Sequence, residues 1–465
     1  MCRYWRQSVI STPENWTRIS SKRAQLAKLG LERSKAASLV FSIDMDEVRS
    51  NAAFSDLINP YIKNTDTLYL QSDSSEEEFE QTLQSFLPSM QSLRSLTLVN
   101  GNLGIDGWGW TNDPFSSLPP SLTHLSLINI PLYPSFLHIG TLTSFSLLGF
   151  EFNLHIDTLL DFLEANQSLE SAILSVVFPQ TSLRSSQRRE AIKNQLRNLT
   201  IYSLHAADNN AFIAQIAVQK GANLEICIHD PNVGLNDVRS TVSQPHLLNL
   251  RSPTFMEYHP EKRNTRLLGP NGCFSLTIPP SASVPFEEFV LLPLDDIRTF
   301  HLIRCLHTQF GPIPTPEVFP PFPFPALETL IVEHEPALSQ LFSILFHKPF
   351  ASPSLKSLAF LDCDIDESFM DELIRFSSRR KKTKSAWLYR VVIVNSKGTL
   401  PRFASIDRLG KYVPVVDVRL GKELPSDLKQ DDLLGPHGYF TSGLGNVPHT
   451  CCWCPTRLYP DNLNV

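Results

Sequence analysis

Apolar residues in the stretch 355–365 follow a short, uneven pattern, L-x-x-L-x-F-x-x-C-x-I. Leu358 and Phe360 alternate with their neighbours, as the buried side of a short strand does. Cys363 is small and easily buried, so it suits the point where the chain leaves that strand. One such unit cannot bury its own apolar face. The pattern therefore predicts that similar units stack on both sides of it.

The same pattern recurs along most of the chain. Its fourth position is filled every 20 to 33 residues, close to the roughly 20 to 29 residues of a leucine-rich repeat. We therefore predict an α/β fold, a right-handed leucine-rich-repeat solenoid with a curved parallel sheet and a short helical N-terminal cap. The fourth-position residues are Leu68, Leu96, Leu125, Phe145, Ala172, Leu199, Leu224, Leu248, Leu276, Phe300, Leu330, Leu358, Val391 and Val416. We expect Leu96, Leu125, Leu199, Leu276, Leu330 and Leu358 to lie buried in one row.

The segments between these strands are of several kinds. Helical spacing predicts helices over 54–62, 79–87, 156–165, 209–219 and 367–376, and an opening strand over 39–43. The proline-rich stretch 311–325 favours an extended return segment, and a docking ligand rich in proline is the alternative. A basic run at 379–384 follows the last helix, where it suits the helix C-terminus. A nuclear-import signal is the alternative there.

Composition narrows the class of protein. The 465 residues carry a net charge of −6, which argues against a nucleic-acid partner. The widely spaced Cys227, Cys273, Cys305 and Cys363 indicate buried thiols in a reducing compartment. The N-terminus lacks the apolar core of a signal peptide, and no apolar run reaches the length of a membrane span. We expect an intracellular protein, cytoplasmic or nuclear, with no membrane contact.

The sequence contains no catalytic motif that we can identify. A phosphate-binding glycine loop and a nucleophile elbow are both absent from it. His449, Cys451 and Cys454 have metal-like spacing, but a structural zinc site needs a second pair of ligands. We therefore predict no catalytic residue, no metal and no cofactor, and hence a recognition protein rather than an enzyme.

The residues that point outward from the predicted strands give a candidate contact surface. In the first half these positions hold mostly small hydroxyl side chains, such as Ser126, Ser144 and Ser146, and in the second half charges of mixed sign. Such a surface favours a protein or peptide target on the concave face over nucleic acid. The candidate partner-binding residues are His124, Tyr202, Arg251, His301, Glu333, Arg390, Asp417 and Arg419.

A resemblance to a known family lies at the N-terminus. The sequence segments C-R-Y-W-R-Q and S-T-P-E-N-W-T, within residues 2–17, resemble the C-terminal part of the F-box of fungal, basidiomycete-type F-box proteins. The stretch 29–39, with L-E-R-S-K, is similar to the segment that follows it. The resemblance implies a substrate receptor of a cullin-type ubiquitin ligase. It also implies an adaptor-side remnant of Tyr4, Trp5, Arg6 and Trp16.

The family's F-box starts well upstream of this match, so we expect an N-terminally truncated F-box that binds the ligase adaptor weakly or not at all. We expect Trp5 and Trp16 to be buried against the first repeats instead. The alternative is a free-standing leucine-rich-repeat scaffold without ligase association. The predicted domains are a residual F-box-like helical cap (1–38), an irregular leucine-rich-repeat solenoid (39–434) and a poorly ordered C-terminal tail (435–465).

Overall fold

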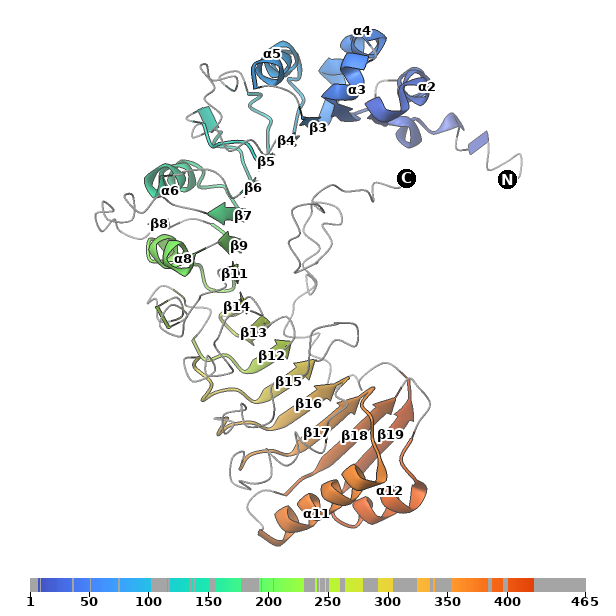
Figure 1. Cartoon of the computed structure of the whole chain (residues 1–465), viewed down its shortest axis with the longest axis vertical. Helices are drawn as coiled ribbons and strands as arrows, with labels where there is room; N and C mark the ends of the chain where they lie inside the picture. Colours follow the sequence, from blue (N-terminus) through green and yellow to red (C-terminus); the bar gives the residue numbers. More distant parts are fainter. Residues whose placement is uncertain are drawn as a thin grey trace. The chain divides into compact units, whose positions relative to one another are not determined.

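The protein is described by a computed structural model (Figure 1), and it forms two compact units, 1–249 and 250–465. The structure describes residues 7–8, 10–35, 37–50, 52–73, 76–101, 115, 118–133, 135–136, 139–149, 155–176, 192–193, 195–203, 205–229, 239–240, 242, 247, 251–259, 264–278, 292–303, 324–334, 338, 353–383, 387–395 and 400–421. Tyr4, Trp5, Arg6, Leu248, Cys305, residues 311–323 of the proline-rich stretch and the predicted tail 435–465 lie outside these residues.

The first unit is built on a parallel sheet, in which each strand pairs with the next one along the chain. Its strands are β1 (Arg18–Ser20), β2 (Leu39–Asp44), β3 (Thr65–Ser72), β4 (Ser95–Asn100), β5 (His124–Ile128), β6 (Ser144–Leu148), β7 (Ser171–Val176), β9 (Asn198–Ser203) and β11 (Asn223–Ile228). A two-stranded pair, β8 (Ile192–Lys193) and β10 (Ile216–Ala217), lies apart from this sheet.

The register of this sheet places equivalent repeat positions directly opposite one another. One row holds Phe41, Leu68, Leu96, Leu125, Phe145, Ala172, Leu199 and Leu224. Every side chain in this row is at most 2% exposed. The row predicted for Leu96, Leu125 and Leu199 is thereby confirmed, and repeat-to-repeat stacking supplies the core.

Helices fill many of the return segments of this unit. They are α2 (Ala24–Ser34), α3 (Met45–Ser50), α4 (Ala52–Ile58), α5 (Glu76–Phe86), α6 (Ile156–Ala165) and α8 (Ala206–Ile213). Shorter 3₁₀ turns are η1 (Pro13–Trp16), η2 (Ser21–Arg23), η3 (Asn59–Asn64) and η4 (Leu87–Ser89). The predicted helix over 156–165 coincides with α6. The helix predicted over 209–219 is displaced, because α8 begins earlier and its end leads into β10.

The sheet begins earlier in the chain than the sequence indicates. β1 lies inside the segment predicted to be a helical cap, and it pairs in parallel with β2, with Ile19 opposite Phe41. Ile19 is 2% exposed. Three residues are too few to show an alternating pattern, so this strand has no clear sequence signal. Helix α2 then returns the chain from β1 to β2, as a first repeat.

The second unit combines parallel repeats with an antiparallel insertion. Its strands are β12 (Phe255–His259), β13 (Asn264–Gly269), β14 (Gly272–Thr277), β15 (Thr299–Ile303), β16 (Thr329–Glu333), β17 (Ser357–Leu361), β18 (Arg390–Asn395) and β19 (Val415–Leu420). β12 and β15 to β19 pair in parallel, and their register aligns Met256, Phe300, Leu330, Leu358, Val391 and Val416. Helices α11 (Glu367–Thr383) and α12 (Phe403–Gly410) lie along one side of these strands (Figure 1).

The prediction that Leu276 belongs to the same buried row was wrong. Met256 occupies that row, while Leu276 lies on β14 opposite Thr265, in the antiparallel meander of β12, β13 and β14. Leu276 is still buried, at 2% exposed. The G-P-N-G turn at 269–272 joins β13 to β14, and Gly272 in it has a φ of 117° that favours glycine. The turn reverses the chain where the repeat spacing predicts a crossover.

The basic run at 379–384 was predicted to follow the helix over 367–376, but its residues 379–383 are instead part of α11, which continues to Thr383. Arg380 within it is 4% exposed, and its Nη2 donates to the backbone oxygen of Leu355 at 3.0 Å. Burial lowers the pKa of Arg380 to about 10. A side chain with these contacts is part of the packing between α11 and the turn before β17, so this arginine is not accessible as part of an import signal.

Both units are therefore leucine-rich-repeat solenoids of the α/β class, as predicted. Three of the predicted buried thiols are confirmed, because Cys227, Cys273 and Cys363 are free and at most 5% exposed. Cys363 donates to the backbone oxygens of Leu361 and Val332, as its position at the end of the strand requires. The curvature of the sheet and the hand of the coil stay predictions.

Candidate functional site

The face of each sheet that points away from the helices is called the outer face here. In the second unit, Phe360 packs against Phe369 of α11, with ring centroids 5.2 Å apart, so its row faces the helices. The residues between these rows point to the outer face. One outer row runs Glu257, His301, Ile331, Ala359, Val392 and Asp417. Five of the predicted contact residues lie on this face, namely His301, Glu333, Arg390, Asp417 and Arg419.

A cluster of carboxylates and imidazoles occupies one part of this outer face. The Nε2 atom of His301 lies 3.1 Å from Oε2 of Glu333, and Nε2 of His334 lies 3.3 Å from Oε1 of the same carboxylate. On β12, Nε2 of His259 lies 3.0 Å from Oε1 of Glu257. These five residues are named the His–Glu cluster. Their side chains are 14% to 29% exposed, so a partner can reach them.

The charges of the His–Glu cluster favour ionised carboxylates. Hydrogen bonding from His301 lowers the pKa of Glu333, and this effect outweighs the opposing effect of burial. Burial alone would raise the pKa of Glu257, but the hydrogen bond from His259 and the nearby charges of His259, Arg266 and His301 together lower it. Both glutamates therefore keep a negative charge in a partly buried setting, where a charge interacts more strongly than in water.

Sequence reasoning found His301 and Glu333 but missed the other three members. Glu257 and His259 are two residues apart on β12, which is the spacing of neighbours on one strand face. The sequence pattern did not identify these two residues because it predicted the strand of this repeat near Leu248, before the observed β12. The structure places Arg251, a predicted strand residue, in a bend before β12, where its backbone oxygen accepts from Nδ2 of Asn271 at 2.7 Å.

Next to the His–Glu cluster the outer face is apolar. The residues of this apolar patch are Ile331, Ala359, Leu361, Val392 and Val394. They are at most 6% exposed, although they point away from the helices. The segments that form β16 to β18 are continuous apolar runs rather than alternating ones, which is typical of strands buried on both faces. The sequence therefore carried a signal for this patch, which the repeat pattern alone did not reveal.

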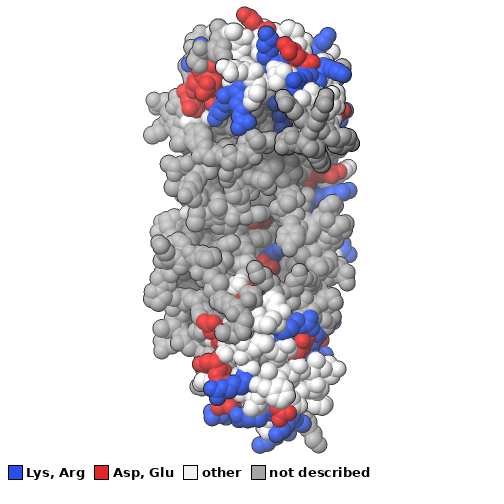
Figure 2. Space-filling view, turned by 90° about the vertical axis from the view of Figure 1, so that its right-hand side faces the viewer, with Lys and Arg blue, Asp and Glu red and all other residues white. Residues whose placement is uncertain are grey.

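At the last two strands the outer face is charged again. Asp417 lies between two arginines, with its Oδ2 3.9 Å from Nη2 of Arg390 and its Oδ1 3.0 Å from Nε of Arg419. Arg419 is exposed, whereas Arg390 is largely covered. Figure 2 shows one side of the molecule, on which basic and acidic side chains are interspersed among the described residues.

The outer face of the first unit is mostly uncharged. His124 is exposed on β5, and its Nδ1 lies 2.8 Å from Oγ1 of Thr123. Tyr202 stacks on His229 with ring centroids 6.2 Å apart, and burial lowers the pKa of His229. Ser126 and Ser146 are buried, with Ser144 partly covered beside them. The predicted hydroxyl-rich surface is thus present but less accessible than the strand positions suggest.

Trp16 is the one member of the predicted adaptor-side remnant that lies within the described residues. It is only partly buried, and the guanidinium carbon of Arg33 lies 4.4 Å from the centroid of its ring. The prediction that Trp16 is buried against the repeats was therefore wrong in its extent. Trp16 is the last residue of η1, which precedes β1, and its ring packs against Arg33 of α2.

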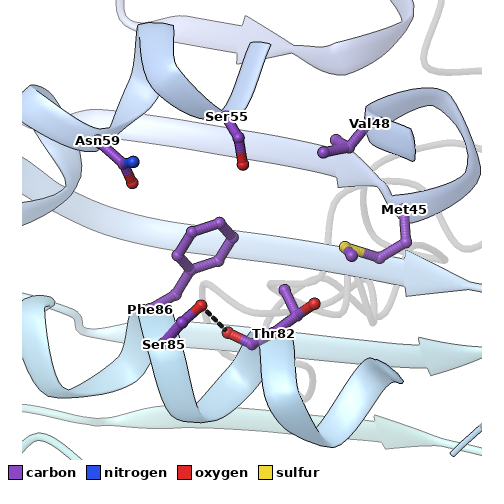
Figure 3. A pocket seen from close by; sticks show the side chains of 7 residues that line it. All are labelled: Met45, Val48, Ser55, Asn59, Thr82, Ser85 and Phe86. Carbon is purple, nitrogen blue, oxygen red and sulfur yellow. Dashed lines mark hydrogen bonds between the residues drawn. The ribbon is translucent and has the colours of Figure 1, made fainter. Parts of the chain in front are cut away.

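The helix side of the first unit has a shallow pocket (Figure 3). Its volume is about 390 Å³, and its lining residues come from α3, α4, α5 and the start of η3, namely Met45, Val48, Ser55, Asn59, Thr82, Ser85 and Phe86. The Oγ of Ser85 donates to the backbone oxygen of Thr82 at 2.8 Å. No titratable side chain lines this pocket, so the described residues provide it with no group for acid–base chemistry.

Within the described part of the chain, no three or more histidine, cysteine or acidic side chains come together as they would around a metal ion. Among the helices of the described ranges, none has both the length and the hydrophobicity needed to cross a bilayer.

Comparison with known proteins adds little to this picture. No family model matches this chain, and no curated protein matches it. Among solved structures, it is similar to the leucine-rich repeat-containing protein LegL7 from Legionella pneumophila, at 12% identity over 79% of this chain and 89% of that chain, with a TM-score of 0.22. A likeness this weak carries no argument. The assignment to the leucine-rich-repeat fold rests on the strand register described above.

Proposed function

We propose that this protein is a non-catalytic recognition scaffold, and that the His–Glu cluster on the outer face of the second unit binds a basic segment of a protein partner. The observation that carries this proposal is the pair of partly exposed glutamates held ionised by neighbouring imidazoles. A lysine or arginine side chain of a partner would complete such a site with charge-assisted hydrogen bonds.

The parallel sheet supports this use of the cluster. Each member is fixed on a strand or at a strand end, so the carboxylates are held in place before a partner arrives. A rigid arrangement of this kind reduces the entropy lost on binding. The mixed signs further along the face, at Arg390, Asp417 and Arg419, suit a protein surface better than a phosphate backbone.

An array of 15-residue peptides of graded charge tests the proposal. The full-length protein should bind the lysine- and arginine-rich peptides preferentially, and increasing salt should weaken the binding. The double variant Glu257→Gln/Glu333→Gln should lose this preference, whereas Glu328→Gln, which changes a more exposed carboxylate paired with Lys356, should retain it. Binding that is independent of peptide charge, or equal in all three proteins, would contradict the proposal.

The finer proposal is that residues 1–38, as the remnant of a truncated F-box, contact a cullin-ligase adaptor weakly, so that the bound partner becomes a ubiquitination target. Its support is the sequence resemblance at Tyr4, Trp5, Arg6 and Trp16. Co-purification with the adaptor would test it, comparing the chain with a Tyr4→Ala/Trp5→Ala variant and with a Trp387→Ala control. If the chain retains its basic-peptide preference but shows no adaptor binding, the free-standing scaffold is the correct function.

A further inference from the structure

The last strand within the described residues is β19, at one end of the second unit's sheet. β19 pairs with β18 in parallel, and among the described residues β18 is the one strand in register with it. The backbone N–H of Val415 donates to Tyr389, and that of Gly421 donates to Asn395. The direction of the backbone hydrogen-bonding groups alternates along a strand, so the N–H and C=O groups of the odd-numbered residues point to β18. The N–H and C=O groups of Val416, Val418 and Leu420 therefore point to the opposite edge.

The side chains of this strand are also less covered than those of its neighbours. Val391, Val392, Ile393 and Val394 on β18 are at most 1% exposed. In contrast, Val415 to Val418 are only partly buried, and Leu420 is 63% exposed. Phe403, at the start of α12, is 82% exposed. Among the described residues, β19 thus combines a strand edge that has no paired strand with exposed apolar side chains, a combination that favours association with another strand.

We propose that β19 pairs in antiparallel fashion with β19 of a second copy of this chain, about a two-fold axis at Val418. The sequence Val416-Asp417-Val418-Arg419-Leu420 is self-complementary in this arrangement. Val418 of one copy lies opposite Val418 of the other, and Val416 lies opposite Leu420 of the other copy. Apolar side chains therefore meet on the face that bears the core. Asp417 of each copy lies opposite Arg419 of the other, so opposite charges meet on the outer face.

The hydrogen-bond geometry agrees with this register. Val416, Val418 and Leu420, whose backbone groups point outward, become the hydrogen-bonded pairs of the antiparallel ladder. Asp417 and Arg419 become the non-hydrogen-bonded pairs, in which side chains approach more closely. A shift of the axis by one residue to Asp417 or Arg419 would place like charges opposite each other. The charge pattern therefore selects this register.

The association should be weak and reversible. A pair of six-residue strands with a few flanking side chains falls near or below the roughly 1,000 Å² of a stable interface. We therefore expect a monomer–dimer equilibrium in the micromolar range, with a dissociation constant of about 10 to 100 µM.

Sedimentation velocity of the full-length protein from about 1 to 200 µM tests the proposal, a range chosen to span that constant. The wild type should shift from monomer to dimer with concentration. Arg419→Asp places like charges opposite each other twice and should weaken association about tenfold. Asp417→Arg/Arg419→Asp restores opposite pairs and should recover association to within about threefold of the wild type.

A second variant addresses the backbone. Val418→Pro removes an N–H that points away from β18, so the ladder inside the monomer is retained while the pairing across the two-fold axis is lost. Circular dichroism at each concentration checks that the variants are folded. A wild type that stays monomeric, a double variant that fails to recover, or undiminished association of Arg419→Asp would each overturn the proposal. None of these outcomes bears on the His–Glu cluster, which lies on other strands.

Discussion

Glu333 on β16 accepts a hydrogen bond from His301 on the neighbouring strand, although the two residues are not directly opposite. His301 lies opposite Ile331, and Glu333 lies opposite Ile303, so the 3.1 Å contact between Nε2 and Oε2 runs diagonally across the pair of strands. Long side chains can reach across this diagonal, and the contact joins two repeats on the outer face. The stability of the second unit should therefore depend on the ionisation of Glu333.

The pH dependence follows from the sign of that pKa shift. The pKa of Glu333 in the folded protein lies below its usual 4.5. Its contribution to stability is therefore fully present above that value and is lost as the pH falls through the lower, folded-state pKa. Glu333→Gln should lower the melting temperature at neutral pH and flatten its fall between about pH 5 and pH 3. Thermal unfolding followed by circular dichroism over this range measures both effects. Glu328→Gln is the control, and equal acid slopes in all three proteins would contradict the assignment.

Leu358 lies in the helix-facing row of the second unit, between Leu330 and Val391, and all three side chains are at most 1% exposed. Leu358→Ala should remove about 2 to 5 kcal/mol from the free energy of unfolding, through lost apolar burial and a remaining cavity. Lys356→Ala, two residues earlier with a side chain 59% exposed, should change it by less than about 0.5 kcal/mol. Urea denaturation measures the difference, and similar effects of the two substitutions would argue against the repeat register.

Arg380 connects the last turns of α11 to the turn before β17 through the backbone oxygen of Leu355. Arg380→Met keeps much of the apolar bulk but leaves that buried carbonyl without its donor, which should cost about 1 to 3 kcal/mol. Arg379→Met, at an exposed position of the same helix, is the matched control. Comparable melting temperatures of the two variants would show that the arginine has no structural role.

Gly30 allows α2 to approach the first strand closely. A Cβ at this position would lie 2.7 Å from Cδ1 of Ile19 and 3.3 Å from the backbone oxygen of Trp16. Gly30→Val should therefore destabilise the first unit by about 1 to 3 kcal/mol, because the site is already filled. At Gly410, the last residue of α12, a Cβ has no atom within 4 Å, so Gly410→Val should have little effect. Chemical denaturation of both variants tests whether α2 packs on β1 as described.

The repeat pattern predicted the buried rows because one strong period dominates it, and the structure aligns Leu96, Leu125, Leu330 and Leu358 accordingly. The repeat pattern did not predict local features that depart from this period, such as a tight turn or a very short strand. The G-P-N-G turn joins β13 and β14 in antiparallel pairing, so Leu276 lies in the meander while Met256 on β12 lies in the buried row. The three-residue strand that contains Ile19 has too few positions to reveal a period.

The candidate site could be predicted only in part, for a similar reason. His301 and Glu333 follow directly from correctly placed strands. Glu257 and His259 were missed because the position of their strand was wrong, and His334 was missed because it lies just beyond a strand end. Nor can strand alternation alone show that Val392 and Ala359 are buried on the outer face, because that depends on what packs there.

The strand register also has a mechanical consequence. Within either unit, the backbone ladders join each parallel strand to its immediate neighbours, and these bonds run along the direction in which the repeats stack. Tension applied along that direction loads the ladders in series and opens them one at a time. Under force, each unit should therefore unfold stepwise, one repeat at a time and at low force, instead of unfolding in a single event at high force.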